Sequence, residues 1–176
     1  DSSSGRFTTD KGEHIDAPLT LDVLAMGRMP HWRRLIPKAF AKPGDLIMLY
    51  TPGLKKIGLG GSLLNDLYGE IGDDLPEVDL KQLRAGWFDY HLMLKQLRWS
   101  RSIHSRSVVA EGGLIRRLFE MSLCSGLGCQ ISFNTADPLQ WLCGELNTAI
   151  VFTASSSLKW PKFLALKDYH LLGSVV

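Results

Sequence analysis

The chain has 176 residues, of which 45% are hydrophobic and 22% are charged, the usage of an ordinary globular protein with one sizeable core. The net charge is only +2 and no run of Lys and Arg is longer than a pair, which argues against a dedicated nucleic-acid binder. No apolar run approaches the roughly 20 residues that a membrane span needs, so we expect no membrane contact. The 3 cysteines form no Cys-x-x-Cys pair, and we predict no metal site.

The first part of the chain is expected to carry little structure. Residues 1–17 are polar and lack periodicity, so we interpret them as a flexible linker or an expression remnant, and residues 18–176 as one domain. Apolar residues alternate over 19–26, which predicts a strand. The sequence Lys42-Pro43-Gly44-Asp45 predicts a turn, and the apolar run over 46–50 predicts a buried strand after it.

A glycine-rich segment, Gly58-Leu59-Gly60-Gly61-Ser62, leads into a short predicted helix over 63–68. Glycines at a helix start can expose backbone N–H groups to a phosphate, although a flexible loop is the more common meaning of such a segment. Lys55 and Lys56 just before it could add positive charge or merely solvate a turn. The longest helix is predicted over 79–99, where apolar residues recur every three or four positions.

The stretch from Glu111 to Ile131 joins a diglycine turn, an amphipathic helix and a strand. Gly112 and Gly113 open the helix, whose apolar side chains fall on one face. Residues 129–133 then alternate between apolar and polar, which is typical of a half-buried strand. Before the turn, residues 107–110 offer one hydroxyl and no charged group, where a loop that handles phosphate would need charge.

The last third of the chain continues the alternation of helices and strands. Asp137 and Pro138 predict the start of a short helix, because Asp is favoured at the N-cap and Pro at the first helical position. A strand over 148–153, a helix over 158–166 and a strand over 170–175 follow. Several connections are too short to join parallel strands, so we predict an α+β fold, a mixed β-sheet with helices packed on one face, rather than a doubly wound fold.

The order of these motifs resembles formylglycinamidine ribonucleotide synthase. The shared motifs are Leu-Ile-Met-Leu-Tyr, then Gly-Leu-Gly-Gly-Ser-Leu-Leu, a long helix, the diglycine helix, and Leu-Cys-Gly-Glu at 142–145 where the family has Leu-Phe-x-Glu. Over about residues 17–175 the chain is similar to the C-terminal half of one of that enzyme's PurM-like modules. The resemblance therefore implies a PurM C-terminal-like fold.

The chain also departs from the family's pattern. Enzymes of the family carry His-Asp-Val-Ser-Asp-Gly-Gly where this chain has the run from Ser107 to Gly113. The groups implied to bind substrate and metal-nucleotide are missing at Ser107 and Val108, and Glu111 has a longer side chain than Asp. We therefore expect a catalytically inactive copy with no cofactor. The remnants of its phosphate loops would be Gly58, Gly60, Gly61, Ser62, Gly112 and Gly113.

Such inactive copies are characteristic of the large tegument proteins of gammaherpesviruses, of the Epstein-Barr virus type. That resemblance implies a place in the virion tegument and the host nucleus, and a non-catalytic domain that binds the histone chaperone Daxx, with or without histones, to relieve silencing of viral DNA. Exposed aromatic residues and lysines would anchor the partner. The candidates are Trp32, Tyr68, Trp99, Trp160, Lys55 and Lys56. The alternative is a segment of an active ATP-dependent formylglycinamidine ribonucleotide synthase whose other modules supply the missing ligands.

Overall fold

The computed structural model describes residues 5–16, 22–29, 31–32, 35–97, 102–146, 148–159 and 166–176. The chain divides into two compact units, Asp1–Arg33 and Arg34–Val176. The predicted domain boundary after residue 17 falls within the first unit and stays a prediction.

The first unit contains a β-hairpin where the sequence suggested a linker without secondary structure. Its antiparallel strands are β1 (Arg6–Thr8) and β2 (His14–Asp16), joined at their ends by an Arg6–Asp16 ion pair of 2.7 Å. The strand predicted over 19–26 is wrong for residues 22–26, which have no regular structure, and residues 19–21 lie outside the described residues. The apolar side chains of this segment are not packed against a core, since Val23 and Met26 are 79% and 89% exposed.

A five-stranded sheet forms the centre of the second unit, in the order β6-β8-β3-β9-β7. These strands are β3 (Leu46–Tyr50), β6 (Ile103–Val108), β7 (Cys129–Ile131), β8 (Ile150–Ala154) and β9 (Tyr169–Val175). Each neighbouring pair in the order is antiparallel. A separate two-stranded ladder pairs β4 (Leu54–Lys56) with β5 (Glu77–Val78).

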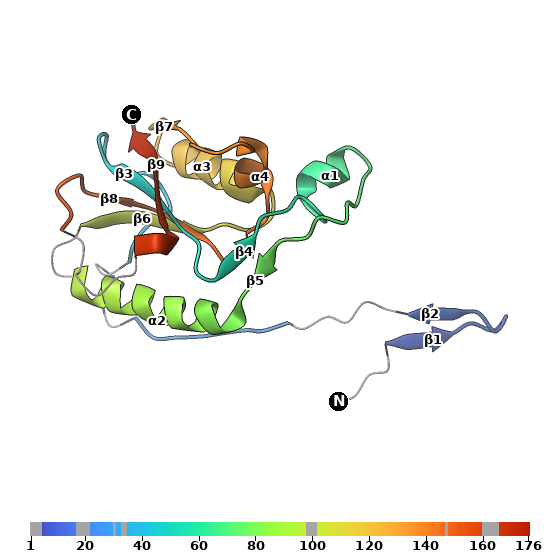
Figure 1. The fold of residues 1–176 in the computed structure, drawn as a ribbon. Coiled ribbons are helices and arrows are strands. Elements are labelled where there is room, and N and C mark those ends of the chain that lie inside the picture. Colours follow the sequence, from blue (N-terminus) through green and yellow to red (C-terminus); the bar gives the residue numbers. More distant parts are fainter. Residues whose placement is uncertain are drawn as a thin grey trace. The chain divides into compact units, whose positions relative to one another are not determined.

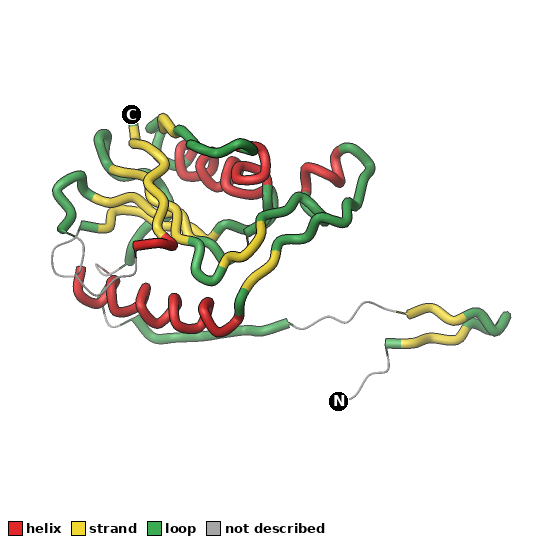
Figure 2. Tube along the Cα trace, viewed as in Figure 1, coloured by secondary structure: helices red, strands yellow, loops and turns green. Residues whose placement is uncertain are grey.

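Helices cover both faces of this sheet (Figure 1). The long helix α2 (Leu80–Leu97) packs on one face through a core that includes Tyr90 and Met93. On the other face lie α3 (Gly113–Leu123) and α4 (Pro138–Cys143), and Figure 2 shows the strands lying between the two helical layers. In the part of the chain that the structure describes, no helix is long and apolar enough to cross a membrane.

The central strand β3 explains why both faces are covered. Ile47 and Leu49 belong to the core under α3, whereas Met48 and Tyr50 belong to the core under α2. Side chains alternate between the two faces of a strand, so an uninterrupted apolar run can bury both. The predicted α+β class is confirmed; in detail the five-stranded sheet is antiparallel throughout rather than mixed, and its helices cover two faces rather than one.

Most of the remaining elements predicted for the second unit are present. The predicted helix over 63–68 is α1 (Leu63–Leu67), and the one over 79–99 is α2. The strand predicted over 129–133 is β7, the one over 148–153 is β8, and the one over 170–175 is β9.

The helix predicted over 158–166 is not helical at residues 158 and 159, and residues 160–165 lie outside the described residues. A short 3-10 helix, Leu166–Asp168, follows them.

Strand β6 was missed because it is polar. Its Ser105 is fully buried, and the Ser105 hydroxyl hydrogen-bonds the Thr153 hydroxyl at 2.7 Å inside the sheet core. The two buried hydroxyls are each other's hydrogen-bond partners, so a polar residue can be buried here. The strand therefore lacks the hydrophobic periodicity that would predict it. Ser107 and Val108 are therefore the last two residues of a sheet strand.

Candidate functional site

Two glycine-rich segments that are distant in sequence meet at one carboxylate. Glu145 Oε1 accepts a hydrogen bond of 2.8 Å from the N–H of Leu63, the first residue of α1, and one of 2.9 Å from the N–H of Gly112, the N-cap of α3. Glu145 itself follows α4 by two residues. The meeting point, called the glycine junction below, consists of residues 58–63, 111–113 and 142–145.

Close backbone contacts require glycine at this junction. A Cβ on Gly113 would lie 2.6 Å from the carbonyl oxygen of Leu142, and a Cβ on Gly58 would lie 1.9 Å from that of Asp74. Gly112 and Gly113 also have φ values of +77° and +70°, in the left-handed region that other residues rarely adopt. Backbone packing thus holds each glycine segment against another part of the chain, and Glu145 links the two segments.

Most N–H groups of the segment predicted as a phosphate loop point to carbonyl groups of the chain itself. Gly60 donates to the Asp74 carbonyl at 2.8 Å and Gly61 to the Ile71 carbonyl at 2.7 Å. The Ser62 hydroxyl accepts a hydrogen bond from the N–H three residues later and so caps α1. The N–H groups of Leu63 and Gly112 converge instead on the Glu145 carboxylate.

A cluster of charges lies on α3 beside the junction. Arg116 contacts Glu111 at 3.2 Å and Glu120 at 3.2 Å, while Arg117 contacts Glu120 at 2.6 Å. Lys38 forms a further ion pair with Glu120. Hydrogen bonding by Lys38, followed by the charges of Arg117 and Lys38, holds the pKa of Glu120 below its usual range. The cluster therefore keeps the Glu120 carboxylate ionised in the second half of α3.

This cluster predicts a pH-dependent contribution to stability. Because the pKa of Glu120 is depressed in the folded state, its ion pairs stabilise the fold above the pKa of the unfolded chain, and this stabilisation is lost as pH falls through the folded value. We expect Glu120→Gln to lower the free energy of unfolding at about pH 7, and the difference from the parent chain to shrink towards about pH 3. Urea unfolding at several pH values measures this.

The exposed Glu70 provides the control for that experiment. Glu70→Gln should change the unfolding free energy little at any pH, because exposed single charges contribute weakly. A Glu120→Gln effect that stays constant with pH would contradict the assignment of the cluster.

The positions expected to have lost ligands lead directly into the junction. Ser107 is partly buried at the end of β6, and Val108 is 48% exposed. Val109 is fully buried, and its N–H donates to the Ala149 carbonyl at 2.9 Å. The Glu111 side chain is 67% exposed and paired with an arginine of α3. None of these contacts tests whether ligand groups were lost here, and that assignment stays a prediction.

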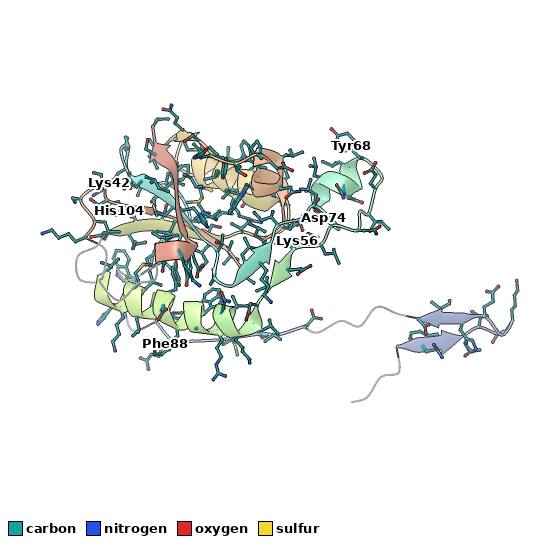
Figure 3. The ribbon with its side chains drawn as sticks, viewed as in Figure 1. Lys42, Lys56, Tyr68, Asp74, Phe88 and His104 are labelled. Carbon is teal, nitrogen blue, oxygen red and sulfur yellow. The ribbon has the colours of Figure 1, made fainter. Side chains whose placement is uncertain are left out.

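The aromatic candidates for partner binding do not gather at the junction. Tyr68 follows α1 and is 77% exposed (Figure 3), and Trp32 in the first unit is 78% exposed. Trp99 and Trp160 lie outside the described residues. Exposure suits an anchor residue but does not identify a partner, so their role stays a prediction.

The two candidate lysines are engaged in ion pairs. Lys55 lies 3.6 Å from Asp79, and Lys56 lies 2.5 Å from Asp74, which faces it in Figure 3. Hydrogen bonding and the charge of Asp74 raise the pKa of Lys56. Both lysines thus pair with aspartate side chains close to β5.

A buried His–Asp pair lies at the start of the central strand. His104 Nδ1 lies 2.7 Å from Asp45 Oδ2, and only 14% and 6% of the two side chains is exposed. The Asp45 carbonyl also accepts a hydrogen bond of 2.9 Å from the N–H of Val175. The pair fastens the predicted turn to two strands. Within the described ranges no group of three or more His, Cys, Asp or Glu side chains could hold a metal ion.

Glu145 is the residue of the candidate site that the sequence pattern did not predict. It was noted as part of the Leu-Cys-Gly-Glu motif, without a role. The signal that could have found it is a carboxylate next to Gly144, where a Cβ would lie 2.5 Å from the Gln140 carbonyl oxygen and 3.2 Å from that of Gly58. Partners 82 and 33 residues away along the chain cannot be read from local pattern.

Comparison with curated proteins identifies relatives of one kind, and no family model matches the chain. The chain is 25% identical to phosphoribosylformylglycinamidine synthase of Schizosaccharomyces pombe over 66% of this chain and 10% of that protein. It is 30% identical to the PurL subunit of the synthase from Wolinella succinogenes, over 66% of this chain and 15% of the subunit. Identity is also 30% with PurL of Carboxydothermus hydrogenoformans, over 74% of this chain and 17% of the subunit. The chain thus spans less than a fifth of each of these relatives.

Solved structures show the same fold. Thermotoga maritima PurL complexed with FGAR has a TM-score of 0.58 at 14% identity, over 82% of this chain and 26% of that one. Phosphoribosylformylglycinamidine synthase II from Thermotoga maritima has a TM-score of 0.53 at 14% identity, over 82% of this chain and 24% of that one. At such identities the likeness shows the fold alone, and it confirms the PurM-like architecture that the resemblance implied.

These relatives correct the expectation that the chain is not an enzyme. The matching proteins are synthases, and nothing in the comparisons marks this chain as an inactive copy. The predicted Daxx partner, tegument origin and nuclear location are tested by neither the structure nor the comparisons and stay predictions. The chain is homologous to a segment of phosphoribosylformylglycinamidine synthase.

Proposed function

We propose that this chain is a segment of an active ATP-dependent phosphoribosylformylglycinamidine synthase, in which other parts of the enzyme complete the active site. The observation that carries this proposal is the 30% identity to two PurL subunits over 66% and 74% of the chain. Because the chain spans only 15% and 17% of those subunits, the activity of the whole enzyme is part of the proposal.

The glycine junction is the part of the chain that suits such a role. Backbone N–H groups of Leu63 and Gly112 both donate to Glu145 Oε1, so the chain's own carboxylate holds the two glycine segments beside the diglycine turn. Arg116 lies over the turn, since its Cδ would be 2.6 Å from a Cβ on Gly112. Thermotoga maritima PurL has been solved in complexes with ATP and with FGAR, and both ligands carry phosphate.

We assign different roles to the two carboxylates of the junction. Glu145 is a positioning residue, because both of its hydrogen bonds go to the backbone and fix the two glycine segments relative to each other. Glu111 is exposed and carries only the Arg116 ion pair among its side-chain contacts in the described chain, so it can turn towards a ligand. Arg116 Nη1 then becomes available to a phosphate, while Arg116 Nε stays paired with Glu120. The junction would orient a phosphate-bearing substrate, and that contributes to catalysis by position.

Ligand binding tests this proposal. In the protein that contains this chain, ATP–Mg²⁺ or formylglycinamide ribonucleotide should raise the melting temperature in a saturable way, because each binds the folded state. Arg116→Gln and Glu111→Ala should each weaken that binding about tenfold, measured by calorimetry. Lys81→Gln on the exposed start of α2 is the matched control and should bind as the parent does. Binding of neither ligand, or equal binding by all variants, would overturn the assignment.

A further inference from the structure

A pocket lies on the sheet face that carries α4, and none of its lining residues belongs to the glycine junction. Its volume is about 340 Å³, and it is bounded by the loop 132–135 after β7, by Trp141 of α4 and by residues 170–172 of β9. Small-molecule sites have volumes of about 300 to 1,000 Å³, so this pocket suits a small ligand. The Ser132 N–H donates to the Leu172 carbonyl at 2.8 Å, which ties the loop to β9.

Aromatic rings form the wall of this pocket. The rings of Phe133 and Trp141 stack with centroids 6.3 Å apart and planes inclined by 29°. The ring of His170 meets Trp141 edge-on, with centroids 5.1 Å apart. Phe133 and Trp141 also pack against the core, which fixes their orientation. Flat, immobile π faces of this kind favour a planar ligand.

The polar groups around the rings are uncharged. Asn134 and Ser132 side chains make no hydrogen bonds within the described residues, and both can donate and accept. His170 Nε2 lies 3.0 Å from Thr51 Oγ1, and burial lowers the pKa of His170, so its ring is neutral at neutral pH. The lining contains no Asp, Glu, Lys or Arg. A charged ligand would therefore find no ionic partner among the lining residues.

We propose that this pocket binds a planar, uncharged nitrogen heterocycle of nucleobase size, stacked against Trp141 and hydrogen-bonded at its edge by Asn134. Asn134 and Ser132 are exposed polar groups at the pocket, so a ligand with hydrogen-bonding groups at its edge gains contacts that a purely apolar ring does not. A nucleotide or nucleic acid would bring phosphate to a lining without cations, so the free base is the favoured source. This site is independent of the phosphate role proposed for the glycine junction.

Adenine is the probe that tests this site, titrated into the chain and followed by amide and indole NMR signals. We expect saturable shifts of the Trp141 indole N–H and the Asn134 side-chain amide, with a dissociation constant of about 1 mM or tighter for so small a ligand. The signals of Gly112 and Gly113 should stay unchanged, which separates this site from the junction. Indole, with a similar shape but fewer hydrogen-bonding groups, should bind at least about fivefold more weakly.

Variants make the test specific. Asn134→Ala, at an exposed loop position, should keep the fold and weaken adenine binding about fivefold, and Trp141→Leu should weaken it about tenfold. Leu139→Ala on exposed α4 surface outside the lining is the control and should bind as the parent does. If Trp141→Leu fails to fold, Asn134→Ala decides. No saturable shift at the solubility limit of adenine, equal affinity for indole, or tighter binding of adenosine monophosphate would overturn the proposal.

Discussion

Replacing Gly113 with alanine should lower the free energy of unfolding by about 2 to 5 kcal/mol. Gly113 has a φ of +70°, where a residue with a Cβ pays about 1 to 2 kcal/mol. The new Cβ would also lie 2.6 Å from the Leu142 carbonyl oxygen and 2.7 Å from the Cys143 carbonyl carbon, and backbone atoms cannot rotate away. Relieving such overpacking costs a further amount of about 1 to 3 kcal/mol. Urea unfolding measures the sum.

The neighbouring glycine provides a matched control. Gly112 has a similar φ of +77°, but a Cβ there would meet the Arg116 side chain, with Cδ at 2.6 Å, and that chain can move. Gly112→Ala should therefore cost only the backbone term of about 1 to 2 kcal/mol. Equal losses of unfolding free energy for the two substitutions would show that Gly113 is not closely packed against the backbone at the end of α4.

Glu145→Ala should lower the free energy of unfolding by about 2 kcal/mol, because it removes the acceptor of two backbone donors in a partly buried place. The N–H groups of Leu63 and Gly112 would keep no protein partner, and their two segments would separate more easily. Glu145→Gln retains an oxygen acceptor and should recover more than half of the loss. Urea unfolding of the three chains gives the comparison.

The exposed carboxylate of the same junction tests whether the effect belongs to this position. Glu111 is 67% exposed and paired with Arg116 at 3.2 Å. Glu111→Ala should therefore cost about 0.5 kcal/mol or less, as is usual for a surface ion pair. A loss on Glu145→Ala no larger than that on Glu111→Ala would remove Glu145 from its positioning role.

Local signals predicted the elements of the second unit where they were strong. The apolar run after the 42–45 turn predicted β3 residue for residue, and Asp137 with Pro138 predicted the start of α4. The Asp79 carboxylate caps α2 by accepting from the N–H groups of Lys81 and Gln82 at 2.9 Å and 3.1 Å. Caps and apolar runs are local, so their chemistry can be read without knowing the fold.

Tertiary contacts decided what could not be predicted. The polarity of β6 is satisfied by Thr153, 48 residues away along the chain, so no local signal marks Ser105 as buried. The second helical layer follows from Tyr90 and Met93 meeting the face of β3 that carries Met48, a pairing that periodicity cannot assign. The sequence showed the two glycine segments, but only the folded structure shows that both are hydrogen-bonded to Glu145. Assigning loss of activity from Ser107 and Val108 relied on absent side chains alone, and the similarity to synthases corrected it.

The strand order has a consequence for self-association. With β6 and β7 outermost, the sheet has two borders whose unpaired backbone groups could recruit a strand from another molecule. On the first border, the Arg106 N–H is already bonded to the Pro37 carbonyl at 2.9 Å, so a preceding loop occupies part of the edge. On the second border, β7 is only 3 residues long. Both edges of the sheet are thus poor templates for pairing with a strand of another molecule. This protects the chain from edge-to-edge aggregation.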